Sequence, residues 1–203
     1  MTDYGVRPLG EDTWPDFARL VERHNGVWGG CWCMAFHEEG VGGSRTSSLN
    51  REDKEARVRS GRAHAALVYD GPECVGWCQF GPVDELPRIK HRRAYLAGRE
   101  GGPRDPADWR ITCFFVARDH RRRGVAAAAL DGALHEIARL GGGSVESYPE
   151  DTADRSVSAS FLHNGTLALF EGRGFTPVRR LGKHHWVVTR AVAGPATGEA
   201  AGA

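Results

Sequence analysis

The sequence predicts a single α+β domain with a mixed, mostly antiparallel central sheet that helices flank. Segments with strand-like and helix-like apolar spacing interleave along the chain. The turn sequence Asp70-Gly71-Pro72 separates two apolar runs, as in an antiparallel hairpin. The continuous apolar run of residues 111–116 (ITCFFV) is typical of a strand buried on both faces. At 203 residues the chain is long enough for one sizeable core.

The first half of the chain contains most of the predicted sheet. Thr13 and Asn50 are candidate N-caps of two helices, which Asn25-Gly26 and Gly61 end. Residues 26–48 between them are rich in glycine but contain aromatic side chains, which indicates an ordered loop over a site rather than a linker. The predicted order is strand 6–9, helix after Thr13, loop 26–48, helix after Asn50, strands 65–69 and 74–80, and irregular segment 81–108.

The second half alternates strands and helices. Strand 111–116 is followed by a helix over 125–140 that a run of glycines ends, and then by strand 145–148. We expect Asn164 to cap a helix that reaches Gly172, and one or two final strands within residues 178–189. Residues 191–203 are small and polar, so we expect a domain of residues 1–190 and a disordered tail.

The charge balance excludes a global electrostatic function. A net charge of +1 provides no field that attracts nucleic acid or an acidic membrane, so we expect neither partner. No secretory signal and no apolar stretch near 18 residues are apparent. Five cysteines, an odd number, then predict reduced thiols in a cytoplasmic protein.

The segment that joins strand 111–116 to the next helix has the geometry of an anion site. The first turn of a helix leaves backbone N–H groups without internal partners, and Gly124 removes the side chain that would keep a ligand away. The helix dipole contributes roughly 0.3–1 kcal/mol. Hydrogen bonds to a charged group contribute about 1.5–3 kcal/mol each, so converging amides dominate over the Arg side chains.

Two motifs carry a resemblance to a known family. The spacing is not that of a dinucleotide-binding or P-loop motif, but Arg121-x-x-Gly124-x-Ala126 resembles the Arg/Gln-x-x-Gly-x-Gly/Ala signature of the GNAT acetyltransferase superfamily. Asn164, followed by the segment 169–175 (LFEGRGF), is similar to the second motif of that family. The resemblance covers about residues 3–190, with 26–60 and 81–108 matching in outline only.

The resemblance implies a GNAT-like α/β/α fold in which two middle strands splay apart to admit acetyl-CoA. The pyrophosphate would contact the amides of residues 122–127, and the pantetheine arm would pair with backbone near residues 115–116. Transfer in this family is direct, from the thioester to an amine. The implied cofactor-binding residues are Phe115, Val116, Arg121, Arg122, Arg123, Gly124, Val125, Ala126, Ala127, Asn164, Phe170 and Arg173.

We expect an N-acetyltransferase that acts on a primary amine of a small molecule. A protein or peptide acetyltransferase and a non-catalytic CoA-binding sensor remain alternatives, as does a longer acyl donor. A deep pocket closed by residues 26–48 and 81–108 would favour a small molecule, and an open groove would favour a peptide. Dimers are common in the family, so a homodimer is consistent with the resemblance.

The sequence departs from the family at the position of a proposed general acid. Many members have a tyrosine where this chain has Phe170, whose ring has no proton to give. Glu146 and Tyr148 share one face of a predicted strand, so we consider Tyr148 as the acid and Glu146 as the group that receives the amine proton. Alternatively, Glu146 faces solvent and Tyr148 is a wall of the pocket.

The loop around Cys31-x-Cys33 is the candidate acceptor wall. The spacing is not that of a zinc site and no second pair follows, so we expect no metal. A redox-sensing thiol would require a lowered pKa, which a sequence does not show. Trp32 on this loop, with Trp77 and Gln79 on one face of strand 74–80, is predicted to bind the acceptor. The alternative is that Trp77 is core and Gln79 an edge residue.

Overall fold

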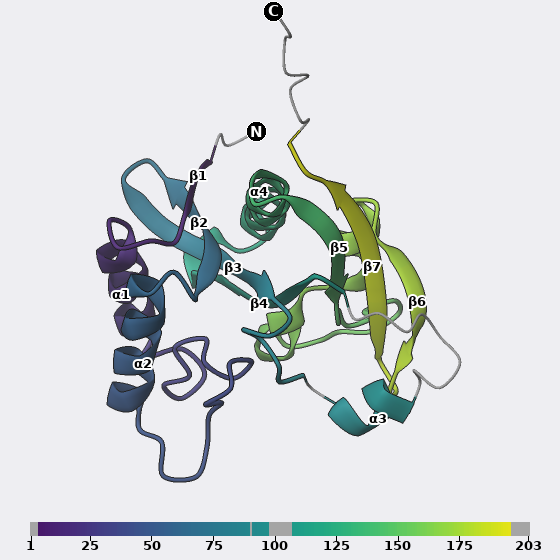
Figure 1. Ribbon diagram of the computed structural model, residues 1–203, viewed down its shortest axis with the longest axis horizontal. Coiled ribbons are helices and arrows are strands. Elements are labelled where there is room, and N and C mark those ends of the chain that lie inside the picture. The colour runs from purple at the N-terminus through teal and green to yellow at the C-terminus, as the bar shows by residue number, and fades with distance from the viewer. Residues whose placement is uncertain (1–3, 90, 98–106, 196–203) are drawn as a thin grey trace, which may run out of the picture.

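The structure is a computed structural model that describes residues 4–89, 91–97 and 107–195. A seven-stranded sheet in the order β1-β2-β3-β4-β5-β7-β6 runs through it (Figure 1). The strands are β1 (Gly5–Pro8), β2 (His64–Asp70), β3 (Glu73–Pro82), β4 (Trp109–Val116), β5 (Gly142–Ser147), β6 (Thr176–Leu181) and β7 (His185–Ala193). Every neighbouring pair is antiparallel except β4 and β5. The predicted mixed, mostly antiparallel α+β fold is confirmed.

Helices cover both faces of the first four strands (Figure 1). On one face, α1 (Trp14–Arg23) packs Phe17 against Trp77 of β3, with ring centroids 4.9 Å apart. On the other, α4 (Val125–Arg139) buries an apolar stripe that includes Leu130 and Ile137. The remaining helices are α2 (Ser47–Arg59), α3 (Arg92–Ala97), α5 (Leu167–Glu171) and the 3-10 turns η1 (Arg118–His120) and η2 (Ala159–Asn164).

The middle of the sheet opens between β4 and β5. The two strands pair only at Trp109–Val145, Arg110–Glu146 and Ile111–Ser147. Beyond Ile111, β4 continues to Val116 beside β3 alone. This is the splay that the fold prediction required.

Two helices begin elsewhere than predicted. Thr46, not Asn50, caps α2, because its hydroxyl accepts the Leu49 N–H at 3.2 Å. Asn50 lies inside the helix and donates to the carbonyl of Gly30 at 2.7 Å. In the same way Thr166, not Asn164, caps α5. Thr and Asn are both favourable N-caps, so local sequence does not decide between them. The tertiary hydrogen bonds of Asn50 and Asn164 take these two residues out of the cap position.

The last strand extends past the expected end of the domain. β7 continues through Ala193, because residues 191–193 pair with residues 142–144 of β5. The rest of the predicted tail, from residue 196, lies outside the described residues, as do residues 90 and 98–106 of the predicted irregular segment. None of the helices among the described residues is long and apolar enough to cross a membrane.

Candidate active site

A cavity of about 670 Å³ lies beside the splayed end of β4. Its walls are the end of β4, the loop and first turn of α4, the segment of η2 and α5, and Trp28. The following predicted cofactor residues line it: Phe115, Val116, Arg121, Arg122 and Ala126. The strand–loop–helix that the sequence singled out therefore forms one side of a single hollow.

The entrance to α4 is open and its backbone is tightly constrained. Gly124 is the N-cap, with φ of 91°, and a Cβ added there would meet nothing within 4 Å. Arg122 also has a positive φ of 60°, and Arg121 donates from Nε to the carbonyl of Val116 at 3.3 Å. The first-turn amides of α4 thus border open space flanked by two guanidinium groups.

The other predicted cofactor residues support this cavity from behind or lie apart from it. Val125 is buried in the core and Phe170 packs edge-on against Phe114 at 5.9 Å, as expected of a phenyl ring that replaces a tyrosine. Arg173 is bound to Asp131 at 2.7 Å. Arg123 is exposed and Ala127 half-buried at the mouth of α4.

Asn164 connects the second sequence motif to the splayed strand. Its side-chain amide donates to the carbonyl of Thr112 at 2.7 Å, just past the last residue of β4 that pairs with β5. The Oδ1 atom of Asn164 is buried and accepts no hydrogen bond from the described residues. A buried acceptor of this kind is costly unless a ligand or water completes it.

A second cavity, of about 510 Å³, adjoins the first. Trp28 and Ser160 line both cavities. The loop after α1 contributes Cys31, Cys33 and Phe36, and β4 contributes Cys113. The 3-10 turn η2 contributes His163, whose ring lies 5.7 Å from Trp28 and 6.4 Å from Phe36.

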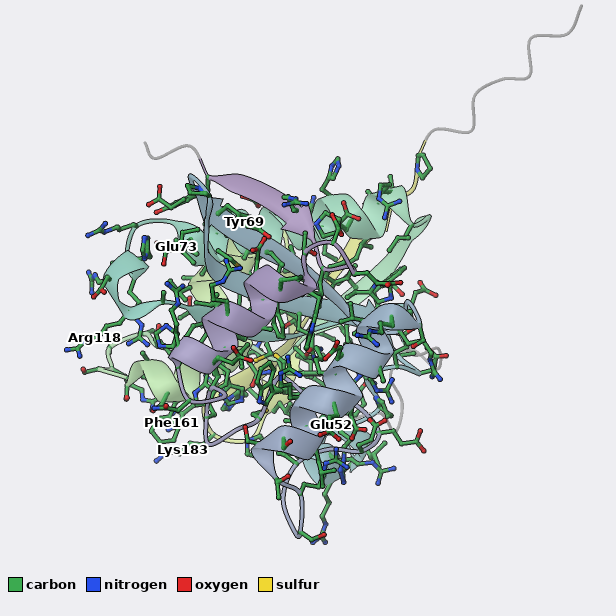
Figure 2. All side chains as sticks on the ribbon, turned by 90° about the vertical axis from the view of Figure 1, so that its left-hand side faces the viewer. Glu52, Tyr69, Glu73, Arg118, Phe161 and Lys183 are labelled. Atoms are coloured by element: carbon green, nitrogen blue, oxygen red, sulfur yellow. The ribbon has the colours of Figure 1, made fainter. Side chains whose placement is uncertain are left out.

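The rim of this second cavity is apolar and exposed. Trp28, Val41 and Phe161 are 39%, 44% and 58% exposed, and all three line it. Figure 2 shows Phe161 at the surface of the molecule. Exposed apolar groups gathered at the mouth of a cavity make it a candidate binding site.

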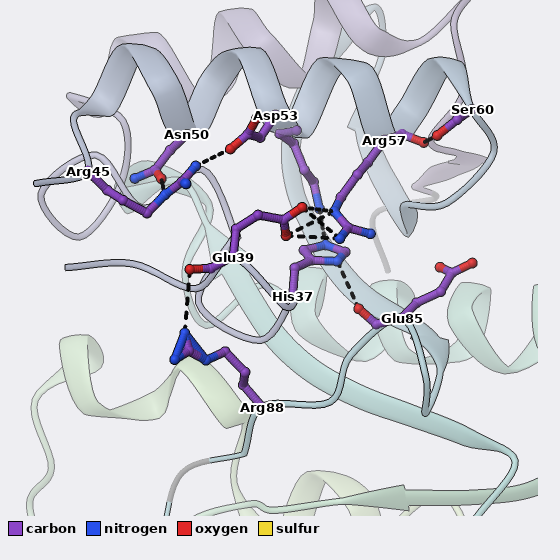
Figure 3. Close-up of polar contacts among 10 residues, drawn as sticks. His37, Glu39, Arg45, Asn50, Asp53, Arg57, Ser60, Glu85 and Arg88 are labelled. Atoms are coloured by element: carbon purple, nitrogen blue, oxygen red, sulfur yellow. Dashed lines mark hydrogen bonds and ion pairs between the residues drawn. The ribbon is translucent and has the colours of Figure 1, made fainter. Parts of the chain in front are cut away.

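Helix α2 fixes the loop that forms much of this wall (Figure 3). Arg57 donates from Nη2 to the Glu39 carboxylate at 2.8 Å, and Arg45 pairs with Asp53. Arg88 donates to the carbonyl of Glu39 at 3.5 Å and itself lines the cavity. The loop is therefore anchored on the helix at two points and faces the 84–89 segment.

The residues predicted to bind the acceptor lie behind this wall, not on it. Trp77 is buried against Phe115 and donates from its indole to the Cys33 sulfur at 3.3 Å. Gln79 is buried and donates to Thr112 Oγ1 at 3.2 Å. Trp32 is buried and donates to Ser47. The predicted common face of β3 is correct, but α1 and the loop cover it, so these side chains shape the cavity through the residues that line it.

Glu146 and Tyr148 point the same way, as strand parity indicates. The Tyr148 hydroxyl donates to Glu146 Oε1 at 2.5 Å, and Tyr95 from α3 and Arg110 from β4 donate to the same carboxylate at 2.9 and 2.8 Å. Burial and the Glu146 charge raise the pKa of Tyr148 well above its ordinary value. Neither residue is among the described residues that line the two cavities.

Several lining residues escaped the sequence analysis. His163 directly precedes Asn164 of the second motif, so its position was the one available signal. Ser160 belongs to a segment with no distinguishing pattern, and Cys113 lies in the apolar run 111–116, whose pattern does not mark it as a lining residue. Within the described residues, no group of three or more His, Cys, Asp or Glu side chains could hold a metal ion.

Comparison with known proteins agrees with the fold and the motifs. Among solved structures, the chain is similar to an arylalkylamine N-acetyltransferase (like 5b) of mosquito, with a TM-score of 0.54, 11% identity, and 93% of this chain and 100% of that chain covered. It is also similar to a structure from Corynebacterium glutamicum described as histone acetyltransferase HPA2 and related acetyltransferase, with a TM-score of 0.53, 18% identity, and coverage of 97% and 99%. Against yncA of Salmonella typhimurium, whose structure contains its cofactor acetyl-CoA, the TM-score is 0.52, with 15% identity and coverage of 97% and 98%. At these identities the likeness shows the fold alone.

The sequence itself shows the family. No curated protein matches the chain at a significant level. The model of the acetyltransferase (GNAT) family matches residues 32–159, which is more than half of the chain and includes most of the loop, β4 and the entrance to α4. The chain therefore belongs to the GNAT family of acyl-CoA-dependent N-acetyltransferases.

Proposed function

We propose that the protein transfers an acetyl group from acetyl-CoA to the primary amine of a small molecule that has an apolar portion. The observation that carries the proposal is the pair of adjoining cavities. One borders the entrance of α4 and the splayed part of β4, the other is apolar, and they share Trp28 and Ser160. A donor and an acceptor placed in these cavities would meet beside β4.

The residues around the first cavity fit acetyl-CoA. The amides of residues 122–127 and the open space at Gly124 suit a diphosphate, and Arg121 and Arg122 add charge. Each amide bond to a phosphate oxygen would contribute about 1.5–3 kcal/mol. Backbone near Phe115 and Val116, with the buried Oδ1 of Asn164, suits the amide groups of a pantetheine arm.

The second cavity supports a small molecule over a peptide. Its walls include residues of the 28–41 loop on one side and Arg88 and Ile89 on the other. These residues belong to the segments 26–48 and 81–108, the two segments expected to close a pocket for a small molecule. Its apolar lining suits a hydrocarbon or aromatic body next to the amine. A peptide would instead need an open groove along the sheet.

His163 is the residue that we propose takes the proton from the acceptor amine. His163 lines the second cavity and has an imidazole side chain. Imidazole is the side-chain group whose unperturbed pKa lies nearest neutral pH. The bound thioester supplies the electrophilic carbonyl. The chain itself needs to orient the amine, accept its proton and exclude water.

The catalytic role of Tyr148 and Glu146 stays an untested prediction, and their contacts favour a structural role instead. Their mutual hydrogen bond, and the bonds of Arg110 and Tyr95 to the same carboxylate, give them a structural role that explains their burial. A role in proton transfer would require contact with the acceptor or the thioester. In that case Tyr148→Phe would lower kcat.

Calorimetric titration with acetyl-CoA, followed by an assay of free CoA release, tests the proposal. We expect binding and turnover on small amines with an apolar portion. No binding at high micromolar acetyl-CoA would refute the proposal. Binding without turnover on a broad amine panel would favour a sensor, and turnover on peptides alone would favour a protein acetyltransferase.

A further inference from the structure

Three of the five cysteines line the apolar cavity. Cys31 and Cys33 come from the loop after α1, and Cys113 comes from β4, eighty positions later than Cys33 in the chain. The other two, Cys74 and Cys78, are buried on β3 and line none of the cavities described above. The thiols of the cavity are therefore gathered by the fold rather than by sequence proximity.

The loop holds the Cys33 thiol against Trp77 of β3 with a strained backbone. Trp32 and Cys33 have positive φ values of 49° and 58°. Left-handed backbone is strained for a residue that has a side chain. The indole of Trp32 donates to Ser47 at 3.0 Å, and the indole of Trp77 donates to the Cys33 sulfur at 3.3 Å. Cys113 lines the same cavity as Cys33, and each of the two thiols shifts the pKa of the other. The two indole hydrogen bonds hold Cys33 in the wall of the cavity that Cys113 also lines.

A completely buried lysine lies behind this pair. His37 must donate from Nδ1 to the carbonyl of Glu85 at 3.1 Å, because a carbonyl only accepts. Its Nε2 therefore accepts from Lys54 Nζ at 3.2 Å, and the Gln79 side-chain oxygen accepts from the same nitrogen at 2.7 Å. Figure 3 shows the hydrogen bond between His37 and Glu85. Among the described residues, Lys54 forms no ion pair with a carboxylate.

The two sulfurs of the pair have opposite acid–base tendencies. Burial alone would raise the pKa of Cys33, but the hydrogen bond from Cys113, the Lys54 charge and the Trp77 indole lower it overall. The pKa of Cys113 is raised well above its ordinary value by its hydrogen bond to Cys33 and by burial. A thiol of lowered pKa beside a thiol of raised pKa is the arrangement in which the first attacks an electrophile and the second resolves the product.

We propose that Cys33 and Cys113 form a peroxide-oxidisable dithiol at the floor of the apolar cavity. The Cys33 thiolate attacks one peroxide oxygen and breaks the O–O bond, which leaves a sulfenic acid on Cys33 and releases hydroxide. The Cys113 sulfur then attacks the Cys33 sulfur. The hydroxyl leaves with the Cys113 proton as water. Two thiols and one hydrogen peroxide become one disulfide and two waters, with sulfur oxidised and peroxide oxygen reduced.

Peroxide can reach the pair, and the bond would change the cavity. The cavity, of about 510 Å³, opens at a rim of exposed apolar residues, and hydrogen peroxide is little larger than water. The disulfide would tie the loop after α1 to β4 across the floor of the cavity. The cavity beside α4 is lined by other residues and would keep its shape.

Mass spectrometry of the full-length protein tests the proposal. The reduced protein is treated with hydrogen peroxide, alkylated with N-ethylmaleimide and digested with trypsin. We expect the tryptic peptides 24–45 and 111–118 to be joined, with fragmentation assigning the bond to Cys33, and the same joining in Cys31→Ser and Cys78→Ser. A Cys31–Cys33 bond, or both thiols still alkylated, would overturn the proposal.

Two further variants test the order of attack. In Cys113→Ser we expect a stable sulfenic acid that dimedone labels on Cys33, and labelling of Cys31 or Cys74 instead would contradict the assignment. Lys54→Met, checked for its melting temperature, should slow the oxidation of Cys33 at neutral pH by at least about tenfold, because an unassisted thiol is only a few per cent ionised. An unchanged rate in a folded variant would count against the pairing with Lys54. These readouts do not depend on acetyl transfer, so they stand apart from the proposed function.

Discussion

Replacing Gly124 by valine tests the diphosphate site directly. Gly124 has φ of 91° and is the N-cap of α4, and the space that a new side chain would enter contains no protein atom within 4 Å. The substitution therefore costs the free protein only the strain of a side chain in left-handed backbone, about 1–2 kcal/mol. In a protein of this size that lowers Tm by roughly 2–8 °C.

The loss of CoA affinity should be larger than this strain explains. If the side chain occupies the place of the diphosphate and breaks one amide hydrogen bond, the loss is about 1.5–3 kcal/mol, or roughly 10–150-fold in Kd. Arg122→Ala removes an exposed guanidinium, and should cost about 0.2–1 kcal/mol, roughly fivefold at most. Isothermal titration calorimetry with CoA, below the Tm of every variant, measures both.

Gly141 provides the matched control. It follows α4 at its other end, about 25 Å away, with φ of 112° and again no protein atom within 4 Å of an added Cβ. Gly141→Val should lower Tm by a similar amount and leave the Kd of CoA unchanged. If Gly124→Val bound CoA like the wild type, or if Gly141→Val lost as much affinity, the assignment of the diphosphate to the α4 amides would be wrong.

Three other substitutions separate structural from catalytic roles. Tyr148→Phe should lower Tm through the lost bond to Glu146, worth about 1.5–3 kcal/mol, and leave kcat unchanged; a tenfold fall in kcat with an intact fold would support the catalytic role. His163→Gln should reduce kcat by about 10²–10⁴ and remove the acid limb of the pH–rate profile without changing the Kd of CoA. Burial, with the Lys54 and Arg57 charges, lowers the pKa of His37 to about 2. Between that pH and pH 6.5, the unfolded chain therefore binds one proton more at His37 than the folded chain does. Stability should therefore fall below pH 6.5, by up to about 1.4 kcal/mol per pH unit, and urea unfolding at pH 7, 6 and 5 should show a weaker fall in His37→Gln.

The sheet and the strand–loop–helix could be predicted because their signals are local. An apolar run, a turn sequence and a glycine at a helix entrance each depend on neighbours in the chain, and β3, β4 and α4 lie where these signals indicate. The helix caps could not be separated in this way. Thr46 and Asn50 are both good caps, and the contact of Asn50 with the distant Gly30 carbonyl places it inside the helix.

The acceptor cavity was less predictable because it is assembled from distant segments. Strand parity correctly placed Trp77 and Gln79 on the face of β3 that α1 and α2 cover. Parity does not say what covers that face. Phe17 of α1 packs on Trp77, and Lys54 of α2 binds Gln79, so both side chains are enclosed. The lining instead comes from the loop, β4 and η2, whose proximity no local pattern encodes.

The splay between β4 and β5 explains how one strand can serve both cavities. A strand that loses a partner must satisfy its backbone by other means, since each buried unpaired group costs about 1–3 kcal/mol. Here Ser147 Oγ donates to the carbonyl of Ile111 at 2.8 Å, Asn164 donates to that of Thr112 at 2.7 Å, and Arg121 donates to that of Val116 at 3.3 Å. These bonds bracket residues 113–115, whose side chains line the two cavities. The side chains that hold the opening at its two ends therefore come from β5, from the second motif and from the first motif, so the opening requires both motifs together.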